Sequence, residues 1–289
     1  MSSGTSTGQF HVTNGQIIGP DGKTFVARGI NIMQGDRPSV STIQNLFPGI
    51  NFVRLPIYNY GSPNELASYV NQLNSAGIVV ELEDHNNNAG GAGGSQGVIF
   101  TGQALTTELN WYSSVAAAFK NNPMVWFGTN NEPSETDSSG NFNAAALSDW
   151  QKATYDAIRN AGNTAPVLLE ANGWANNGQP VMMQGYKASD YAGMTNAIWD
   201  MHYYGWLTNY STDQGTNNNF LGQMVQQVQQ FTDADGKMAV LVGEYGNSTT
   251  GQAIDPNGNQ VVAAVLNAAQ NTGLSTAAWA WGPAIPETD

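Results

Sequence analysis

Residues 124–133, MVWFGTNNEP, join a short apolar run to a polar ending. Such a run is typical of a parallel strand, which is apolar on both faces because helices cover its outer side. Residues 239–246, AVLVGEYG, have the same form and also place a glutamate after the apolar run. The two segments therefore predict parallel strands that carry polar groups at their carboxyl ends.

Segments of this type recur along the chain, separated by stretches with helical periodicity. Strands that alternate with helices predict a parallel sheet, and eight such units predict a closed (β/α)8 (TIM) barrel. The expected strands are 27–32, 51–57, 78–84, 124–129, 166–171, 197–202, 238–243 and 275–281. The clearest expected helices are 64–76, 106–121, 144–161, 220–231 and 260–271. Helical periodicity is weaker between the first and second strands and between the fifth and sixth.

The two ends of the chain depart from the repeat. We expect residues 1–9 to form a flexible tail and residues 10–289 to form one barrel domain. Segments 10–17 and 23–26 flank the turn sequence GPDG at 19–22, which predicts a β-hairpin across the bottom of the barrel. Only eight residues follow position 281, so the last helix of the barrel is expected to be absent from this chain.

Composition limits the classes of partner. The net charge of −13 opposes binding to phosphate backbones and to anionic membranes, so we expect no nucleic acid and no membrane as partner. The chain has no cysteine, which excludes disulfides, thiolate metal sites and thiol nucleophiles. No signal peptide is evident at residues 1–9. The scarcity of lysine and the abundance of Asn, Gln, Ser and Gly favour an extracellular protein, which we expect to be a monomer.

Polar or aromatic residues follow nearly every expected strand. In a (β/α)8 barrel the carboxyl ends of the strands meet at one face, where active sites lie. The residues at these ends are Asn31, Arg54, Asp84, His85, Asn131, Glu132, Asn172, Trp174, His202, Tyr204, Glu244 and Trp281. Their convergence on one face predicts an active site there.

Two of these residues, Glu132 and Glu244, directly follow apolar strands. A carboxylate is costly to bury there unless it is paired or hydrogen-bonded. On the fourth and seventh strands the two would face each other across the mouth of the barrel. Cleavage of a glycosidic bond needs such a pair, one carboxyl group protonated and the other ionised. A separation of about 5–5.5 Å would give retention of configuration, and a wider one inversion.

The ordered series of strand-end motifs resembles glycoside hydrolase family 5, the cellulase and mannanase family of retaining (β/α)8 enzymes. The resemblance covers nearly the whole chain. Its motifs are RGIN at 28–31, VRLP at 53–56, DHN at 84–86, NEP at 131–133, HYY at 202–204, GEYG at 243–246 and AWAW at 278–281. It implies a retaining glycosidase of plant-type polysaccharide that needs neither cofactor nor metal.

The resemblance also implies roles for the matched residues. Glu132 matches the acid/base and Glu244 the nucleophile. Asn131 matches the residue that holds the sugar 2-hydroxyl, a contact that strengthens in the transition state. Arg54 would hydrogen-bond Glu244 and keep it ionised, because a nearby cation lowers the pKa of a carboxyl group.

Further matches lie around this pair. Tyr204 should donate a hydrogen bond to Glu244, with Tyr203 as the rival tyrosine in the HYY motif. His85 and His202 would bind sugar hydroxyls or tune the proton balance. Asn31 would support the site from the first strand.

Aromatic residues supply the expected sugar platforms. Trp281 should lie under the sugar at the cleavage point, while Trp279 shares its strand face but lies deeper. Trp174 and Trp206, in the loops after the fifth and sixth strands, are candidates for further subsites.

The substrate remains open between related polysaccharides. The sequence EANGW at 170–174 resembles the bacterial mannanases, whereas NEP at 131–133 fits the cellulases equally well. We expect an endo-β-1,4-mannanase, with an endo-β-1,4-glucanase as the alternative. A non-catalytic carbohydrate-binding barrel would not need both glutamates. A metal-dependent barrel hydrolase would need more ligands than three histidines, one of them His11 in the hairpin, provide.

Overall fold

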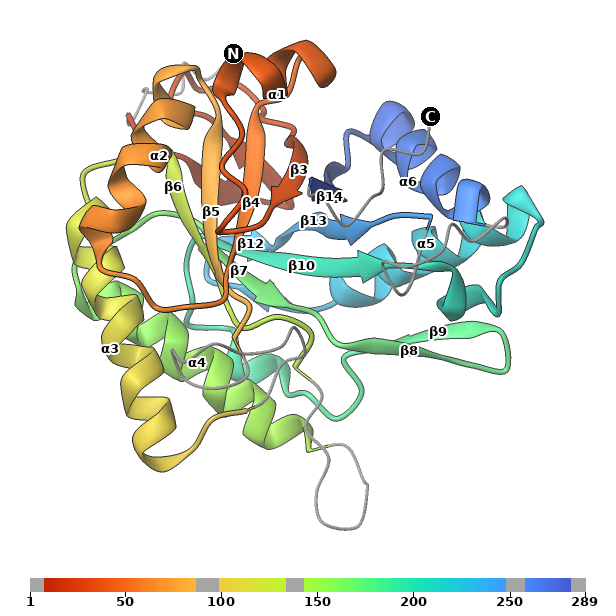
Figure 1. The fold of residues 1–289 in the computed structure, drawn as a ribbon. Helices are drawn as coiled ribbons and strands as arrows, with labels where there is room; N and C mark the ends of the chain where they lie inside the picture. The colour runs from red at the N-terminus through yellow and green to blue at the C-terminus, as the bar shows by residue number, and fades with distance from the viewer. Residues whose placement is uncertain (1–7, 87–98, 134–142, 248–257, 282–289) are drawn as a thin grey trace.

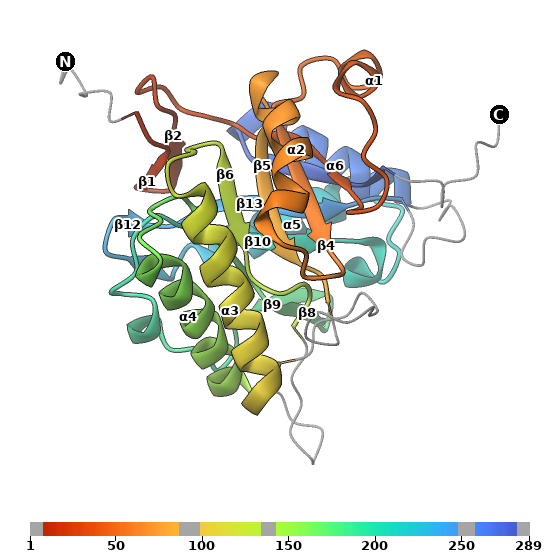
Figure 2. The ribbon, with the colours of Figure 1, turned by 60° about the vertical axis from the view of Figure 1, so that its left-hand side comes forward.

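The core of the molecule is a closed barrel of eight parallel strands with helices outside it (Figures 1 and 2). This computed structural model describes residues 8–86, 99–133, 143–247 and 258–281, apart from the side chain of Trp174. The barrel strands are β3 (Arg28–Ile32), β4 (Phe52–Ile57), β5 (Val79–Asp84), β6 (Val125–Gly128), β7 (Val167–Glu170), β10 (Ala197–Tyr203), β13 (Ala239–Tyr245) and β14 (Ser275–Trp281). They close in the order β10-β13-β14-β3-β4-β5-β6-β7, which confirms the predicted barrel.

Helices cover the outer face of the sheet (Figure 1). They are α1 (Val40–Leu46), α2 (Pro63–Ser75), α3 (Gly102–Phe119), α4 (Ala144–Asn160), α5 (Gln214–Val228) and α6 (Gly258–Thr272). Helix α5 begins earlier than its apolar periodicity predicts. The Asp213 side chain accepts the backbone N–H of Thr216 at 2.6 Å and caps the helix, so a polar first turn becomes helical.

The connection from β7 to β10 contains no α-helix among the residues described there. A hairpin of β8 (Gly173–Asn176) and β9 (Gln179–Met182) takes its place, followed by the short 3-10 helix η1 (Ala188–Asp190). Asn177 and Gly178 both have positive φ, as the tight hairpin turn requires. The Gln227 side chain of α5 holds β9 through bonds of 2.8 Å to Pro180 O and from Met182 N. The weak helical periodicity of this region thus reflects a hairpin.

The N-terminal hairpin is present, but its turn was predicted at the wrong place. Strands β1 (His11–Thr13) and β2 (Gln16–Ile18) are joined by Asn14-Gly15, whose φ angles of 47° and 83° fit a two-residue turn. The GPDG turn is followed only by a single bridge between Ile18 and Thr24. The Phe10 ring lies 5.1 Å from the Trp126 ring of β6. Because Val12 N also donates to Asn196 Oδ1, just before β10, the hairpin closes the amino-terminal end of the barrel.

The remaining elements are small: η2 (Gly205–Thr208), β11 (Thr232–Asp233) and β12 (Gly236–Lys237). No helix in the described ranges is both long and apolar enough to cross a bilayer. Two expectations concern residues largely outside those ranges: the flexible tail at 1–9 and the missing last helix after residue 281.

Strand alternation divides the barrel residues into two sets. On β10, Trp199 faces outward and packs between Tyr191 and Phe231, with ring centroids 4.9 and 5.9 Å away. Asp200 and His202, its neighbours on the opposite face, point into the barrel. The outward-facing residues of the strands therefore pack against the surrounding helices, and the inward-facing positions can be polar.

Candidate active site

Glu132 and Glu244 lie at the carboxyl ends of β6 and β13. Oxygen atoms of both, together with a ring nitrogen of His202, lie within 4.8 Å of one another. The Glu244 side chain is only 5% exposed, whereas that of Glu132 is 35% exposed. Glu132 also has a φ of 41°, a left-handed conformation that is strained for a residue with a side chain. The fold thus aims one buried and one accessible carboxyl group at the same space.

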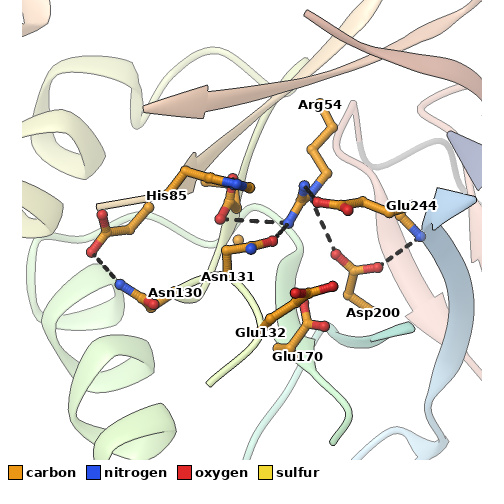
Figure 3. Close-up of polar contacts among 12 residues, drawn as sticks. Arg54, His85, Asn130, Asn131, Glu132, Glu170, Asp200 and Glu244 are labelled. Atoms are coloured by element: carbon orange, nitrogen blue, oxygen red, sulfur yellow. Dashed lines mark hydrogen bonds and ion pairs between the residues drawn. The ribbon is translucent and has the colours of Figure 1, made fainter. Parts of the chain in front are cut away.

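Arg54 is the cation at the centre of the site (Figure 3). Its buried guanidinium donates from Nη1 to Glu244 Oε1 at 2.7 Å and to Asn31 Oδ1 at 3.0 Å. Its Nη2 donates to Asn131 Oδ1 at 3.0 Å. Asn31 in turn donates to the backbone oxygen of Gly243 at 2.7 Å. The predicted contact of Arg54 with Glu244 is present, and Asn31 and Asn131 fix the guanidinium plane.

Three further buried carboxyl groups surround the same guanidinium. Arg54 Nη2 lies 3.5 Å from Glu83, and Arg54 Nε lies 3.5 Å from Asp200 and 3.9 Å from Glu81. Burial lowers the pKa of Arg54, but the charges of these carboxylates and of Glu244 outweigh it and raise the pKa well above its ordinary value. Burial raises the pKa of Glu81, and the negative charge of Asp200 raises it further. The floor of the site is therefore an acidic cluster built around one cation.

Tyr204 is the tyrosine of the HYY motif that reaches Glu244. Its hydroxyl donates to Glu244 Oε2 at 3.0 Å. The hydroxyl of the rival Tyr203 donates instead to the backbone oxygen of Asn217, outside the barrel, at 2.9 Å. Glu244 thus accepts one bond on each oxygen, from Arg54 and from Tyr204, as the sequence predicts.

His202 lies between the carboxyl groups of the site. Its Nδ1 is 2.8 Å from Glu132 Oε1 and 3.4 Å from Glu244 Oε2, while its Nε2 is 3.4 Å from Glu170 Oε2. Burial lowers the pKa of His202, but the negative charges of Glu170, Glu244 and Glu132 raise it well above its ordinary value. Burial raises the pKa of Glu132, yet the hydrogen bond and charge of His202 outweigh that effect and leave it lowered. The contact between Glu132 and His202 therefore shifts the two pKa values in opposite directions.

The two tryptophans of β14 make different ring contacts. The Trp279 ring is stacked on His85, with centroids 5.4 Å apart and planes 17° apart, and His85 is held by Glu83 at 3.0 Å. The Trp281 ring lies 6.3 Å from that of Phe47, which follows α1. Pairing of β14 with β3 is irregular between Ala278 and Trp281, so counting by two along the strand misplaces both rings. The geometry favours Trp279 over Trp281 as the residue at the site.

A pocket of about 180 Å³ adjoins Glu132. It lies between the β8–β9 hairpin and η2, and Glu244 is not among its lining residues. Trp206 lines it and is 45% exposed, as suits a residue that contacts a ligand. Trp174 falls in β8, but its side chain lies outside the described part of the molecule. The residues around the pocket include Glu132, Glu170, Asn172, Met182, His202 and Trp206.

Two groups of side chains have the composition of metal ligands. They are Glu132, His202 and Glu244, and Glu170, Asp200 and His202. Both groups share His202, whose Nδ1 already bonds Glu132, and Arg54 lies beside both Glu244 and Asp200. Cationic side chains thus already balance these carboxylates, and the expectation of a metal-free site stays a prediction.

Sequence reasoning missed Glu81, Glu83, Glu170 and Asp200, and placed Trp279 deeper than Trp281. A signal was available for the first two, because VVELED at 79–84 places acidic residues at alternate positions of one strand. Asp200 shares this alternation with His202. Glu81, Glu83 and Asp200 lie one layer below the strand ends, whereas Glu170 is the last residue of β7.

A parallel barrel with two carboxyl groups facing each other at its carboxyl end defines the class of (β/α)8 glycosidases. Comparison with known families agrees with this class. The pattern of the family Cellulase (glycosyl hydrolase family 5) matches residues 20–285. The chain belongs to glycoside hydrolase family 5.

Curated relatives include mannan- and glucan-acting enzymes. The chain is 24% identical to the mannan endo-1,4-beta-mannosidase of Streptomyces lividans, over 96% of this chain and 67% of that protein. It is 22% identical to the mannan endo-1,4-beta-mannosidase of Cellvibrio japonicus, over 97% of this chain and 61% of that protein. It is 26% identical to the probable endo-beta-1,4-glucanase B of Neosartorya fischeri, over 85% of this chain and 75% of that protein.

Solved structures share the fold. The catalytic domain of the mannanase from Streptomyces sp. SirexAA-E aligns with a TM-score of 0.64 and 20% identity, over 97% of this chain and 83% of that one. The catalytic domain of the major endoglucanase from Xanthomonas campestris pv. campestris aligns with a TM-score of 0.68 and 18% identity, over 95% of this chain and 91% of that one.

Proposed function

We propose that the protein is a retaining endo-β-1,4-glycanase with a preference for β-mannan. The observation that carries the proposal is the approach of Glu132 and Glu244, whose oxygens lie within 4.8 Å of each other. Retaining glycosidases have carboxyl groups about 5–5.5 Å apart, whereas inverting enzymes need about 6.5–9.5 Å to admit a water between them. The spacing favours double displacement through a glycosyl-enzyme intermediate.

Glu244 is the nucleophile in this proposal. Arg54 and Tyr204 each hold one of its oxygens, and the side chain is buried, so the attacking carboxylate is fixed in position. In the first step an oxygen of Glu244 bonds to the anomeric carbon while the glycosidic bond breaks. Asn131, held by Arg54, is positioned to bind the 2-hydroxyl of the same sugar.

Glu132 is the acid/base. Its more exposed carboxyl group borders the pocket that Glu244 does not line, so the pocket fits the sugar that leaves. Glu132 gives a proton to the leaving oxygen, and then takes one from the water that releases the sugar from Glu244. Trp206 would stack on the leaving sugar, and Trp279 on the sugar that is transferred.

Mannan is favoured because two of the relatives described above are mannan endo-1,4-beta-mannosidases. An endo-β-1,4-glucanase is the second candidate, favoured by the glucanase relative and by the endoglucanase structure. Enzymes that act on polymers work outside the cell, so we also propose an extracellular location. A monomer is proposed because a polymer-binding cleft of this kind is complete within one barrel.

The test is reducing-sugar release from β-mannan, carboxymethylcellulose and barley glucan, measured side by side with wild type and Glu244→Gln. We expect release to be greatest from mannan and to vanish in the variant, which should remain folded by circular dichroism. Proton NMR of early products should show the β-anomer first. Initial formation of the α-anomer would refute retention, and a fully active Glu244→Gln would refute the nucleophile.

A further inference from the structure

Glu170 is a buried carboxyl group at the end of β7 with no part in the roles given above. Its Oε2 lies 3.4 Å from His202 Nε2, on the side of the ring opposite Glu132. His202 Nε2 is buried and forms no hydrogen bond among the described residues, so its contact with Glu170 is an ion pair. The His202 imidazole therefore lies between two carboxyl groups, with Glu170 at Nε2 and Glu132 at Nδ1.

The backbone holds Glu170 in this position. Its N–H donates to Thr129 Oγ1 at 3.1 Å, and its carbonyl oxygen accepts from Gln151 Nε2 of α4 at 2.6 Å. Both partners belong to the β6–β7–α4 side of the barrel. Glu170 also lines the pocket beside Glu132, so the two carboxyl groups border one space.

Other charged groups around His202 do not take this place. Asp200 lies two residues before His202 on β10. It accepts the Gly243 N–H at 2.8 Å and faces Arg54. Glu244 lies 3.4 Å from Nδ1 but is held by Arg54 and Tyr204. Glu170 is thus the carboxyl group that faces Nε2 without a cation of its own.

We propose that Glu170 is a positioning residue that holds the Nε2 proton of His202, so that Nδ1 exchanges a proton with the acid/base Glu132. This proposal rests on the proposed glycosidase function. A carboxylate that fixes one nitrogen of an imidazole determines the tautomer and the orientation of the other nitrogen. In His202 the nitrogen fixed by Glu170 is Nε2, and Nδ1, which exchanges the proton, lies 2.8 Å from Glu132 Oε1.

The proton balance is closed over the two steps. Before the first step the Glu132–His202 pair holds one exchangeable proton, in addition to the Nε2 proton at Glu170. Glu132 passes the exchangeable proton to the leaving oxygen as the glycosidic bond breaks. In the second step the attacking water returns one proton to Glu132, and its hydroxide adds to the anomeric carbon as the bond to Glu244 breaks.

The first readout is the pH profile of kcat/KM on the polysaccharide. Burial raises the pKa of Glu170 well above its ordinary value, although the charge of His202 acts against it. Glu170→Gln keeps the shape but cannot carry a negative charge beside His202, so the Glu132–His202 pair should release its proton at lower pH. We expect the alkaline limb to move down by about one pH unit or more. Glu170→Asp should keep the limb closer to wild type. Asp156→Asn, the same change of charge on an exposed residue of α4, should leave it unmoved.

The second readout separates a proton effect from a structural one. Glycosides with a dinitrophenyl leaving group need no proton from the acid, whereas phenyl glycosides do. Both kinds of leaving group are tested as mannobiosides and as cellobiosides. For the phenyl compounds, Glu170→Gln should lower kcat/KM at least about tenfold. For the dinitrophenyl compounds, the decrease should be less than about twofold.

The results that would overturn the inference are distinct from those that would overturn the function. An unshifted alkaline limb, or equal losses on both leaving groups, would make Glu170 a structural residue. Loss of wild-type activity on chelation, restored by a divalent cation, would make Glu170, Asp200 and His202 a metal site instead. If wild type hydrolyses no polysaccharide and no aryl glycoside, the proposed function itself fails.

Discussion

Arg54 donates to Glu244 at 2.7 Å from the centre of a cluster that also contains Glu81, Glu83 and Asp200. One guanidinium therefore positions Glu244 and compensates the charge of the carboxyl groups beneath it. An ammonium group is a point charge and cannot reach Glu244, Asn31 and Asn131 from one plane.

Arg54→Lys should accordingly lower kcat/KM by at least about a hundredfold, because hydrogen bonds to charged groups contribute about 1.5–3 kcal/mol each. Arg54→Met, which leaves buried carboxylates unpaired, should destabilise the fold by about 3–5 kcal/mol. Denaturant titration and initial rates measure the two effects. Arg28→Lys, at an exposed position, is the control and should change neither. Near-normal activity in Arg54→Lys would contradict this account.

Tyr204→Phe removes the bond to Glu244 Oε2 and nothing else that the structure describes for this hydroxyl. The loss of one hydrogen bond to a charged group predicts a decrease in kcat of about 10- to 150-fold. Tyr203→Phe is the matched control, because its hydroxyl bonds to Asn217 on the outer side of the barrel. That variant should lose some thermal stability and keep its kcat, and the opposite pattern would reverse the assignment of the two tyrosines.

The tryptophans of β14 give a second pairwise comparison. Trp279→Ala should lower kcat/KM by about 10- to 100-fold, since the ring that stacks on His85 would no longer contact the sugar. Trp281→Ala should change kcat/KM by less than about threefold, because its ring packs against Phe47. Rates on mannan or cellulose oligosaccharides measure both. A larger loss in Trp281→Ala would restore the sequence-based choice.

The sequence predicted the barrel and the approach of Glu132 to Glu244 because both depend on local pattern. Apolar runs ending in polar residues locate each strand to within two residues, and strand ends converge by topology. The contacts of Arg54 and Tyr204 with Glu244 were expected from the resemblance to glycoside hydrolase family 5, and both are present. The β8–β9 hairpin was not predicted, because its four-residue strands lack a strong pattern.

The inner layer of the site depends on information that a strand pattern does not contain. Whether Glu81 or Asp200 points into the barrel depends on the face of the strand, and alternation gives that face only if the register is known. Trp279 and Trp281 show the limit, since an irregular pairing in β14 reverses the expected order. Glu170 was passed over because its partner, His202, comes from a different strand.

Chelation tests the charge balance of the site. Arg54 and His202 already lie against the carboxyl groups that could bind a cation, so EDTA should leave the rate of hydrolysis within about twofold of the untreated enzyme. Activity measured before and after dialysis against EDTA decides this. A loss that a divalent metal restores would show that the cluster binds a cation after all.

Stability should depend on pH in the direction opposite to that of most acidic proteins. Burial raises the pKa of Asp84 to about 7 and of Asp200 to about 6, although hydrogen bonds to Asp84 and the Arg54 charge near Asp200 act against it. The folded protein therefore binds protons that the unfolded chain, with aspartate pKa values near about 3.9, has released. The stability gained is complete below about pH 4 and is lost as the pH rises through 6 and 7.

We therefore expect the midpoint of thermal unfolding to be higher at pH 5 than at pH 8, with each proton worth about 1.4 kcal/mol per pH unit across its window. Asp84→Asn should flatten part of this dependence, because the amide keeps a hydrogen-bonding group beside Tyr60 and Asn130 but cannot titrate. The exposed Asp156→Asn should leave the slope unchanged. Scanning calorimetry over that range provides the measurement. Equal or greater stability at pH 8 would mean that Asp84 and Asp200 stay ionised in the folded protein, because the hydrogen bonds to Asp84 and the Arg54 charge near Asp200 exceed the effect of burial.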